Sequence, residues 1–163
     1  MTLSHVDAEG RARMVDVGAK RATARVAVAE GHIIMSAAAC AAAESQTGPK
    51  GAVLSAAELA GVMAAKRTAD LIPLCHPLSL DHVAVTATVD RGLPGVVVRA
   101  TVKASDKTGV EMEALTAVAV GLLTVYDMLK AVDRGMEIAA VRLLEKTGGA
   151  GGDWVRAPSG GGR

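Results

Sequence analysis

The sequence predicts an α+β fold in which helices pack on one face of a mainly antiparallel sheet. Three observations lead to this class. The expected elements follow one another as β-β-α-α-β-β-α-β, so strands do not strictly alternate with helices. Residues 90–95, with the sequence DRGLPG, lie between two expected strands and indicate a hairpin. A chain of 163 residues suits one domain with a core and is too short for two.

The first part of the chain is expected to supply two strands and a helix. Met14–Val17 is expected to be a short strand, and Arg21–Ala29 alternates with a period of two residues, as strands with two different faces do. Ile33–Ala43 is rich in alanine, which favours a helix. Gly48–Gly51 contains glycine and proline breakers and is expected to be a loop.

A second helix is expected from about Ser55 to Asp70. Ser55 and Glu58 have the spacing of a capping box, which predicts a helix start at the serine. Pro73 ends this helix because proline cannot continue one. Pro73 and Pro77 then bracket Leu74-Cys75-His76 and are expected to hold this short segment rigidly.

The second half is expected to form a hairpin, a long helix and a last strand. The hairpin strands are Asp81–Val89 and Val96–Lys103, the helix covers about Val110–Asp133, and the strand is Ile138–Leu144. In terms of domains, we expect a flexible N-terminal segment at residues 1–13, a single domain at 14–152 and a disordered glycine-rich tail at 153–163.

Composition argues against several functional classes. Tyr126 and Trp154 are the only aromatic residues, and 18 basic residues oppose 17 acidic ones, so we expect no nucleic-acid partner. The run of low polarity at Ala114–Tyr126 has 13 residues, fewer than the roughly 18–20 that span a membrane. No signal peptide is evident, and Cys40 and Cys75 lack a CxxC spacing, which favours a cytoplasmic protein without a structural metal.

The most informative stretch is Asp106–Glu113, where a lysine-glycine turn leads into two carboxylates at the start of the long helix. A helix N-terminus offers unpaired backbone N–H groups and a positive dipole end, which suit an anionic ligand. The alternative is that Glu111 and Glu113 only complement the helix dipole. Residues two apart on a helix point about 200° apart, so we expect only one of these acids to face a ligand.

Asp127 and Lys130 are the first charged side chains at the far end of this helix. Their spacing also fits an ordinary surface ion pair, but the apolar turns before them lead us to expect a partly buried carboxylate. Fourteen residues separate Glu113 from Asp127, about 21 Å along the helix axis. One site could use both ends if two subunits packed these helices antiparallel; the alternatives are two unrelated sites or one extended ligand.

Other candidates carry weaker signals. A loop histidine such as His76 is more often structural than catalytic, and Cys75 has the character of a small buried hydrophobe. No nucleotide-binding, zinc-protease or serine-hydrolase motif is present, and the histidines lack ligand spacing, so no metal is expected. Five lysines could together offset a triphosphate: Lys50, Lys66, Lys107, Lys130 and Lys146.

Four segments, KRTADLIPLCHP at 66–77, KTGVEMEALTA at 107–117, TVYDMLKAV at 124–132 and VRLL at 141–144, resemble the cyclic pyranopterin monophosphate synthase family, MoaC. The resemblance covers about residues 14–152. It implies a ferredoxin-like α+β fold, a hexamer built as a trimer of dimers and no cofactor. It also implies a lyase of molybdenum cofactor biosynthesis that converts 3′,8-cyclo-7,8-dihydro-GTP to cyclic pyranopterin monophosphate and releases pyrophosphate.

The same resemblance implies roles for individual residues. Asp127, Lys50 and Lys130 match catalytic positions. The segments that contact the substrate are matched by Leu74, Cys75, His76, Met112 and Glu113. Weaker matches are Asp16, Arg25, Lys66, Glu111 and Lys146, and the chain departs from the usual acidic residue at Ala52. The alternative to an enzyme is an oligomeric nucleotide-binding module, which would return the cyclised GTP derivative unchanged.

Overall fold

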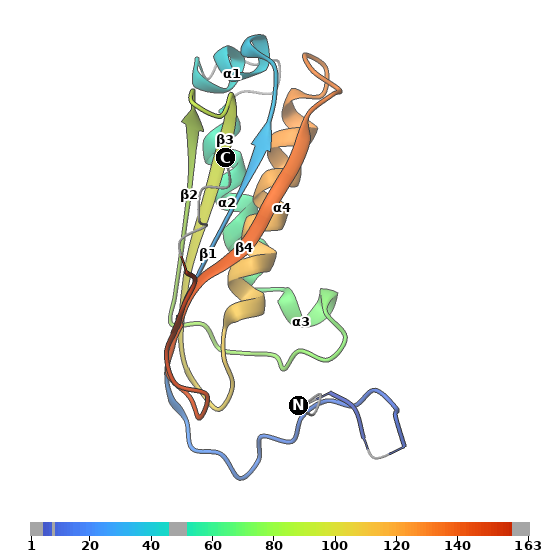
Figure 1. Ribbon diagram of the computed structural model, residues 1–163, viewed down its shortest axis with the longest axis vertical. Coiled ribbons are helices and arrows are strands. Elements are labelled where there is room, and N and C mark those ends of the chain that lie inside the picture. The colour runs from blue at the N-terminus through green and yellow to red at the C-terminus, as the bar shows by residue number, and fades with distance from the viewer. Residues whose placement is uncertain (1–4, 8, 46–51, 158–163) are drawn as a thin grey trace.

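The computed structural model describes residues 5–7, 9–45 and 52–157. Within them, one antiparallel sheet has the strand order β2-β3-β1-β4-β5. The strands are β1 (Thr23–Ile34), β2 (His82–Asp90), β3 (Gly95–Asp106), β4 (Glu137–Thr147) and β5 (Trp154–Val155). The helices are α1 (Ala37–Glu44), α2 (Val53–Ala65), α3 (Thr68–Leu71) and α4 (Glu111–Leu129). Figure 1 shows α2 and α4 on the same face of the sheet, which confirms the predicted class.

The core lies between this helix pair and the sheet. Alternate residues of β3 from Val96 to Ala104 are buried, as expected for a strand with one covered face. The two helices approach closely because glycines lie at their contact. A Cβ on Gly61 would lie 3.0 Å from the carbonyl oxygen of Ala117, and one on Gly121 would lie 3.3 Å from that of Ala57. The helix layer is therefore one packed unit.

Helix α4 is a core helix. Among the described residues it is the one helix long and apolar enough to cross a membrane, but 56% of its most apolar window is buried inside the protein. Val118, Leu122 and Val125 are fully buried against the sheet. Strand β1 accommodates them with Gly31, where an added Cβ would lie 2.9 Å from side-chain atoms of Leu122 and Val118. This contact fixes the position of α4 over the sheet.

Several predicted boundaries were wrong. Residues 14–17 belong to none of the strands in the described part of the chain. Ile33 and Ile34 pair with Val96 and Gly95, so they extend β1 and do not begin a helix. The tail expected to be disordered from residue 153 begins with β5, which pairs with β4. The loop expected at residues 48–51 lies outside the described residues.

The capping box at Ser55 is also absent. Helix α2 starts at Val53, so Ser55 is inside the helix. The Glu58 carboxylate turns instead to the sheet and accepts a hydrogen bond from the backbone N–H of Ala87 at 3.0 Å. This bond ties α2 to β2. The strand order and the β1-α2-β2-β3-α4-β4 succession match the element sequence of a ferredoxin-like motif, but that narrower assignment stays a prediction.

Candidate active site

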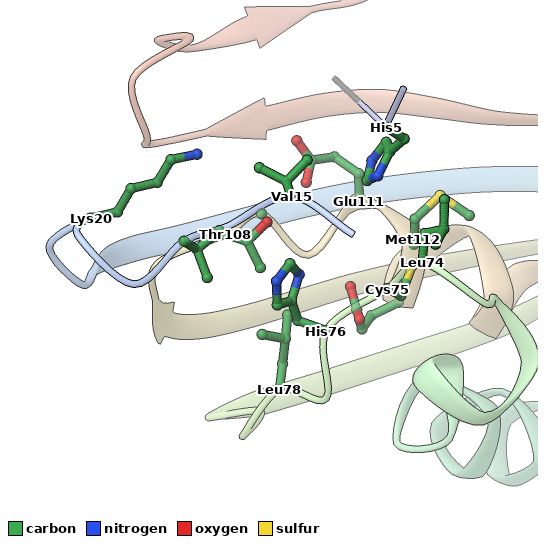
Figure 2. A pocket seen from close by; sticks show the side chains of 13 residues that line it. His5, Val15, Lys20, Leu74, Cys75, His76, Leu78, Thr108, Glu111 and Met112 are labelled. Carbon is green, nitrogen blue, oxygen red and sulfur yellow. The ribbon is translucent and has the colours of Figure 1, made fainter. Parts of the chain in front are cut away.

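A cavity rich in ionisable side chains lies at the end of the molecule where α4 begins. Its volume is about 410 Å³. Three segments meet there: the stretch before β1, the stretch between α3 and β2, and the first residues of α4 (Figure 2). The lining residues are His5, Val15, Val17, Lys20, Leu74, Cys75, His76, Leu78, Thr108, Gly109, Glu111, Met112 and Glu113. All five predicted substrate-binding residues are in this set.

The segment Leu74-Cys75-His76 reaches the cavity from the short helix α3. The backbone N–H of Cys75 donates to the carbonyl of Ile72 at 3.1 Å, which closes a turn around Pro73. Thr68 anchors the preceding turn, because its buried hydroxyl donates to the carbonyl of Ala65 at 3.0 Å. Burial raises the pKa of the Cys75 thiol, and the nearby Glu113 carboxylate raises it further. The Cys75 thiol is therefore protonated and uncharged at pH 7, and it forms part of the cavity lining.

Glu113 is the most deeply buried acid of this site, at 4% exposure. Burial raises its pKa, and the neighbouring charge of Glu111 adds to the rise, while a hydrogen bond from its own backbone N–H opposes it. This hydrogen bond also satisfies one of the free N–H groups at the start of α4. The helix end therefore presents a carboxylate to the cavity, which suits a ligand that donates N–H or O–H groups.

The expectation that only one of Glu111 and Glu113 could face a ligand was wrong. Both line the cavity. Glu111 is the first residue of α4, and its carboxylate folds back against Gly109, where any Cβ would collide with it. Helical spacing does not constrain a side chain that bends back over the preceding turn. The cavity consequently surrounds the start of the helix and does not face only one of its sides.

A network of hydrogen bonds holds the turn before α4. The Arg25 guanidinium donates to the backbone carbonyls of Asp106 and Lys107, each at 3.3 Å. The Lys107 ammonium donates to the carbonyl of Gly18 at 3.0 Å, which ties the turn to the N-terminal stretch. Arg25 and Lys107 thus position the site from outside the cavity lining. Asp16, whose carboxylate accepts from the N–H of Gly18 at 2.8 Å, also lies outside it.

The predicted catalytic pair lies at the opposite end of α4. Lys130 and Asp127 form an ion pair with 2.6 Å between Nζ and Oδ1. The predicted partial burial of Asp127 was wrong for the single chain, since 55% of its side chain is exposed. The sheet and α2 cover only part of the circumference of α4. Lys50, the third predicted catalytic residue, lies outside the described residues.

One face of α4 remains apolar and open. Met112 is 37% exposed and Leu123 is 57% exposed. These residues are eleven apart, or about three turns, so they share a face, and Asp127 continues it one turn later. The exposed face thus runs from the cavity to the Asp127–Lys130 pair. An apolar stripe of this kind on an otherwise packed helix is typical of a contact with another protein surface.

Sequence reasoning missed the contribution of the N-terminal stretch. His5, Val15, Val17 and Lys20 line the cavity, with Lys20 at the opposite end of the view from Leu74 (Figure 2). No spacing or motif connects these residues to α4, because the chain reaches the site through the tertiary fold. Of the weaker matches, Lys66 lies with Glu113 along an adjacent cavity of about 100 Å³.

Comparison with known proteins identifies the family. The MoaC family model matches residues 14–149, most of the chain. The chain belongs to the MoaC family. It is 61% identical over 150 residues to a cyclic pyranopterin monophosphate synthase of Cereibacter sphaeroides, covering 92% of this chain and 94% of that protein. Proteins of the same name match from Roseiflexus sp. at 57% (94% and 97% covered) and from Chloroflexus aggregans at 55% (96% and 95% covered).

Proposed function

We propose that the cavity and the Asp127–Lys130 pair form one active site that converts 3′,8-cyclo-7,8-dihydro-GTP to cyclic pyranopterin monophosphate and pyrophosphate. The chain is a cyclic pyranopterin monophosphate synthase of molybdenum cofactor biosynthesis, as its family and its 55–61% identity over more than nine tenths of its length indicate. The observation that carries the site assignment is the gathering of Leu74, Cys75, His76, Met112 and Glu113 around one cavity.

The cavity suits the base of a guanosine derivative. Part of the cavity lining is uncharged and consists of Leu74, Cys75 and Met112. A flat heterocycle can pack against these side chains. Glu113 accepts hydrogen bonds from the N–H groups of a guanine-like edge, which carries donors next to each other. His76 can donate to or accept from the sugar or the base. In this arrangement the carboxylates at the start of α4 select for a donor-rich base.

The reaction requires several proton transfers, and Asp127 is the proposed carrier. The guanine imidazole ring must open and a pyran ring must form, each with protons moved between heteroatoms. A ribose hydroxyl must then attack the α-phosphorus, while the bond from that phosphorus to the bridging oxygen of pyrophosphate breaks. Asp127 takes the hydroxyl proton. Before this transfer, the Lys130 ammonium, 2.6 Å from the Asp127 carboxylate, balances the negative charge of the carboxylate. Lys50 is the proposed donor to the leaving group.

Two copies of the chain supply this site. Glu113 and Asp127 are about 21 Å apart along one helix, too far to act on one base and its α-phosphate together. Antiparallel packing of the exposed faces of α4 would bring the end of one helix to the start of the other, and would cover Met112 and Leu123. We propose that this pair is the dimer of a hexamer arranged as a trimer of dimers.

The proposed compartment is the cytoplasm. Cys40 and Cys75 are free thiols, as expected where glutathione and thioredoxin keep cysteines reduced. A substrate derived from GTP is also made where GTP is abundant.

Turnover by the purified protein tests the proposal. The chain should convert the synthetic cyclised GTP derivative to cyclic pyranopterin monophosphate, with one pyrophosphate released for each product formed. Asp127→Asn should lower kcat by about 10²–10⁴-fold, the usual contribution of a positioned proton carrier. Glu137→Gln, which neutralises an exposed carboxylate at the start of β4, is the matched control and should keep normal activity. Return of the substrate unchanged by the wild-type protein would instead support a nucleotide-binding module.

A further inference from the structure

A second cavity with a different chemical character lies where α4 ends. Its volume is about 300 Å³, and its lining consists of Tyr126, Lys130, Ala131 and Arg134. Two of these four residues are cationic, and a third carries a hydroxyl that both donates and accepts hydrogen bonds. The cavity at the start of α4 differs, because its lining has two carboxylates, Glu111 and Glu113, beside one lysine, Lys20. The two ends of α4 are therefore suited to different parts of a ligand.

The turn that carries Arg134 is held firmly by its backbone. The Tyr126 hydroxyl donates to the carbonyl of Arg134 at 3.1 Å. The Asp133 carboxylate accepts from the backbone N–H groups of Gly135 and Ser36, at 2.8 and 2.7 Å. These two hydrogen bonds engage both oxygens of the acid next to Arg134 in sequence. The arginine is thus presented from a fixed backbone, which lowers the entropy lost when its side chain binds a ligand.

The positive charge of this cavity is only partly neutralised. Lys130 pairs with Asp127, whereas no carboxylate of the described residues pairs with Arg134. A guanidinium has donors in a planar fork that fits two phosphate oxygens at once. The Tyr126 hydroxyl lies in the same lining, but its single proton is donated to the carbonyl of Arg134, so Tyr126 positions the turn and does not itself donate to a phosphate oxygen. This set of donors suits a polyphosphate and not an uncharged heterocycle.

We propose that Arg134 and Lys130 bind the β- and γ-phosphates of the substrate and hold them as they leave as pyrophosphate, while Tyr126 holds the turn that carries Arg134. The assignment rests on the proposed function above and extends it to a phosphate subsite. Asp127, which pairs with Lys130 of this cavity, would then lie near the α-phosphate, where the ribose hydroxyl attacks. The base would lie in the cavity at the start of the partner's α4. Arg134 is a substrate-binding residue in this arrangement and carries no proton.

Binding of inorganic pyrophosphate to the full-length protein tests the subsite directly. Calorimetry should show pyrophosphate binding to the wild type, weakened about ten- to a hundredfold in Arg134→Gln, the usual effect of removing a charge-assisted hydrogen bond. Arg134→Lys should recover part of the affinity, because the charge returns without the fork. In turnover, Arg134→Gln should raise KM much more than it lowers kcat, and affinity for the cyclic monophosphate product should not change.

Matched variants separate this effect from folding and from general loss of charge. Arg99→Gln removes one exposed guanidinium on the face of the sheet that α2 and α4 do not cover. This variant should bind pyrophosphate with wild-type affinity. If Arg134→Gln does not fold, Tyr126→Phe removes the hydrogen bond to the Arg134 carbonyl while keeping the ring, and should weaken pyrophosphate binding severalfold.

Two results would overturn the subsite. One is a folded Arg134→Gln or Tyr126→Phe protein with wild-type affinity for pyrophosphate, and the other is a wild-type protein that does not bind pyrophosphate. Either result would leave the proposed function in place if the wild type still turned over the substrate. Conversely, an inactive wild type that bound pyrophosphate through Arg134 would remove the proposed function alone.

Discussion

Replacing Gly31 by alanine tests whether α4 lies as close to β1 as the structure has it. A Cβ at this position would lie 2.9 Å from Cδ1 of Leu122, 2.9 Å from Cγ1 of Val118 and 3.0 Å from Cγ2 of Val141. The leucine can move its flexible end, but the two valines are branched at Cβ and rotate poorly. The added methyl group must therefore push α4 from the sheet or bend β4.

The expected magnitude follows from two opposing contributions. Overpacking a core costs about 1–3 kcal/mol. Replacing a strand glycine by alanine returns about 0.5–1 kcal/mol, because glycine loses more freedom on folding. The net destabilisation should be about 1–2 kcal/mol, or a fall in Tm of about 2–8 °C for a chain of this size.

Thermal unfolding followed by circular dichroism, at one fixed protein concentration, measures the effect. Gly92→Ala is the control, because a Cβ on Gly92 would lie 3.3 Å from the Asp90 carboxylate and would touch no core atom. The Tm of this variant should change little. The double variant Gly31→Ala/Val141→Ala should be less destabilised than the sum of its single changes. A Gly31→Ala protein as stable as the wild type would refute the close packing of α4 on β1.

Two further predictions concern the charged and apolar features of α4. Glu113→Gln should raise Tm near neutral pH, because burial raises the pKa of Glu113 and makes its ionised form costly in the folded state. Because the folded-state pKa of Glu113 is raised, the stability of the wild type should fall as pH rises through that pKa. The gain in Tm from Glu113→Gln should therefore shrink in acid, where Glu113 is protonated. A gain in Tm that does not depend on pH would contradict this prediction. Leu123→Lys should dissociate the oligomer in gel filtration and lower turnover more than tenfold, since it charges the exposed apolar face. The control is Val155→Lys, which charges an exposed residue of β5 and should leave the oligomer intact. If the Leu123→Lys protein had the same oligomer size as the wild type, the interface between subunits would not lie on the exposed face of α4.

Much of the fold could be predicted from local patterns. The hairpin of β2 and β3 and the long helix α4 were recognised because each has its own period and its own turn residues. Strand β1 was predicted too short, since Ile33 and Ile34 are fixed by pairing with β3, a contact between residues far apart in sequence. The capping box failed for a related reason. Glu58 binds the backbone of β2, so its partner could not be seen from the helix sequence.

The site was partly predictable for similar reasons. Leu74, Cys75 and His76 were found because prolines and motif resemblance marked them, and they line the same cavity as Met112 and Glu113. His5 and Lys20 were missed because only the tertiary fold brings the N-terminal stretch to α4. The exposure of Asp127 was missed because composition does not reveal which side of an apolar helix stays uncovered.

The most direct test of a site shared between copies is complementation between two inactive variants. Glu113→Gln and Asp127→Asn proteins, each nearly inactive alone, would be unfolded, mixed in equal amounts and refolded together. With random pairing, half of the dimers contain one chain of each kind, and one of their two sites has both wild-type residues. Activity should therefore return to about a quarter of the wild-type level. A mixture no more active than its two components would contradict the shared site and place Glu113 and Asp127 in separate functions.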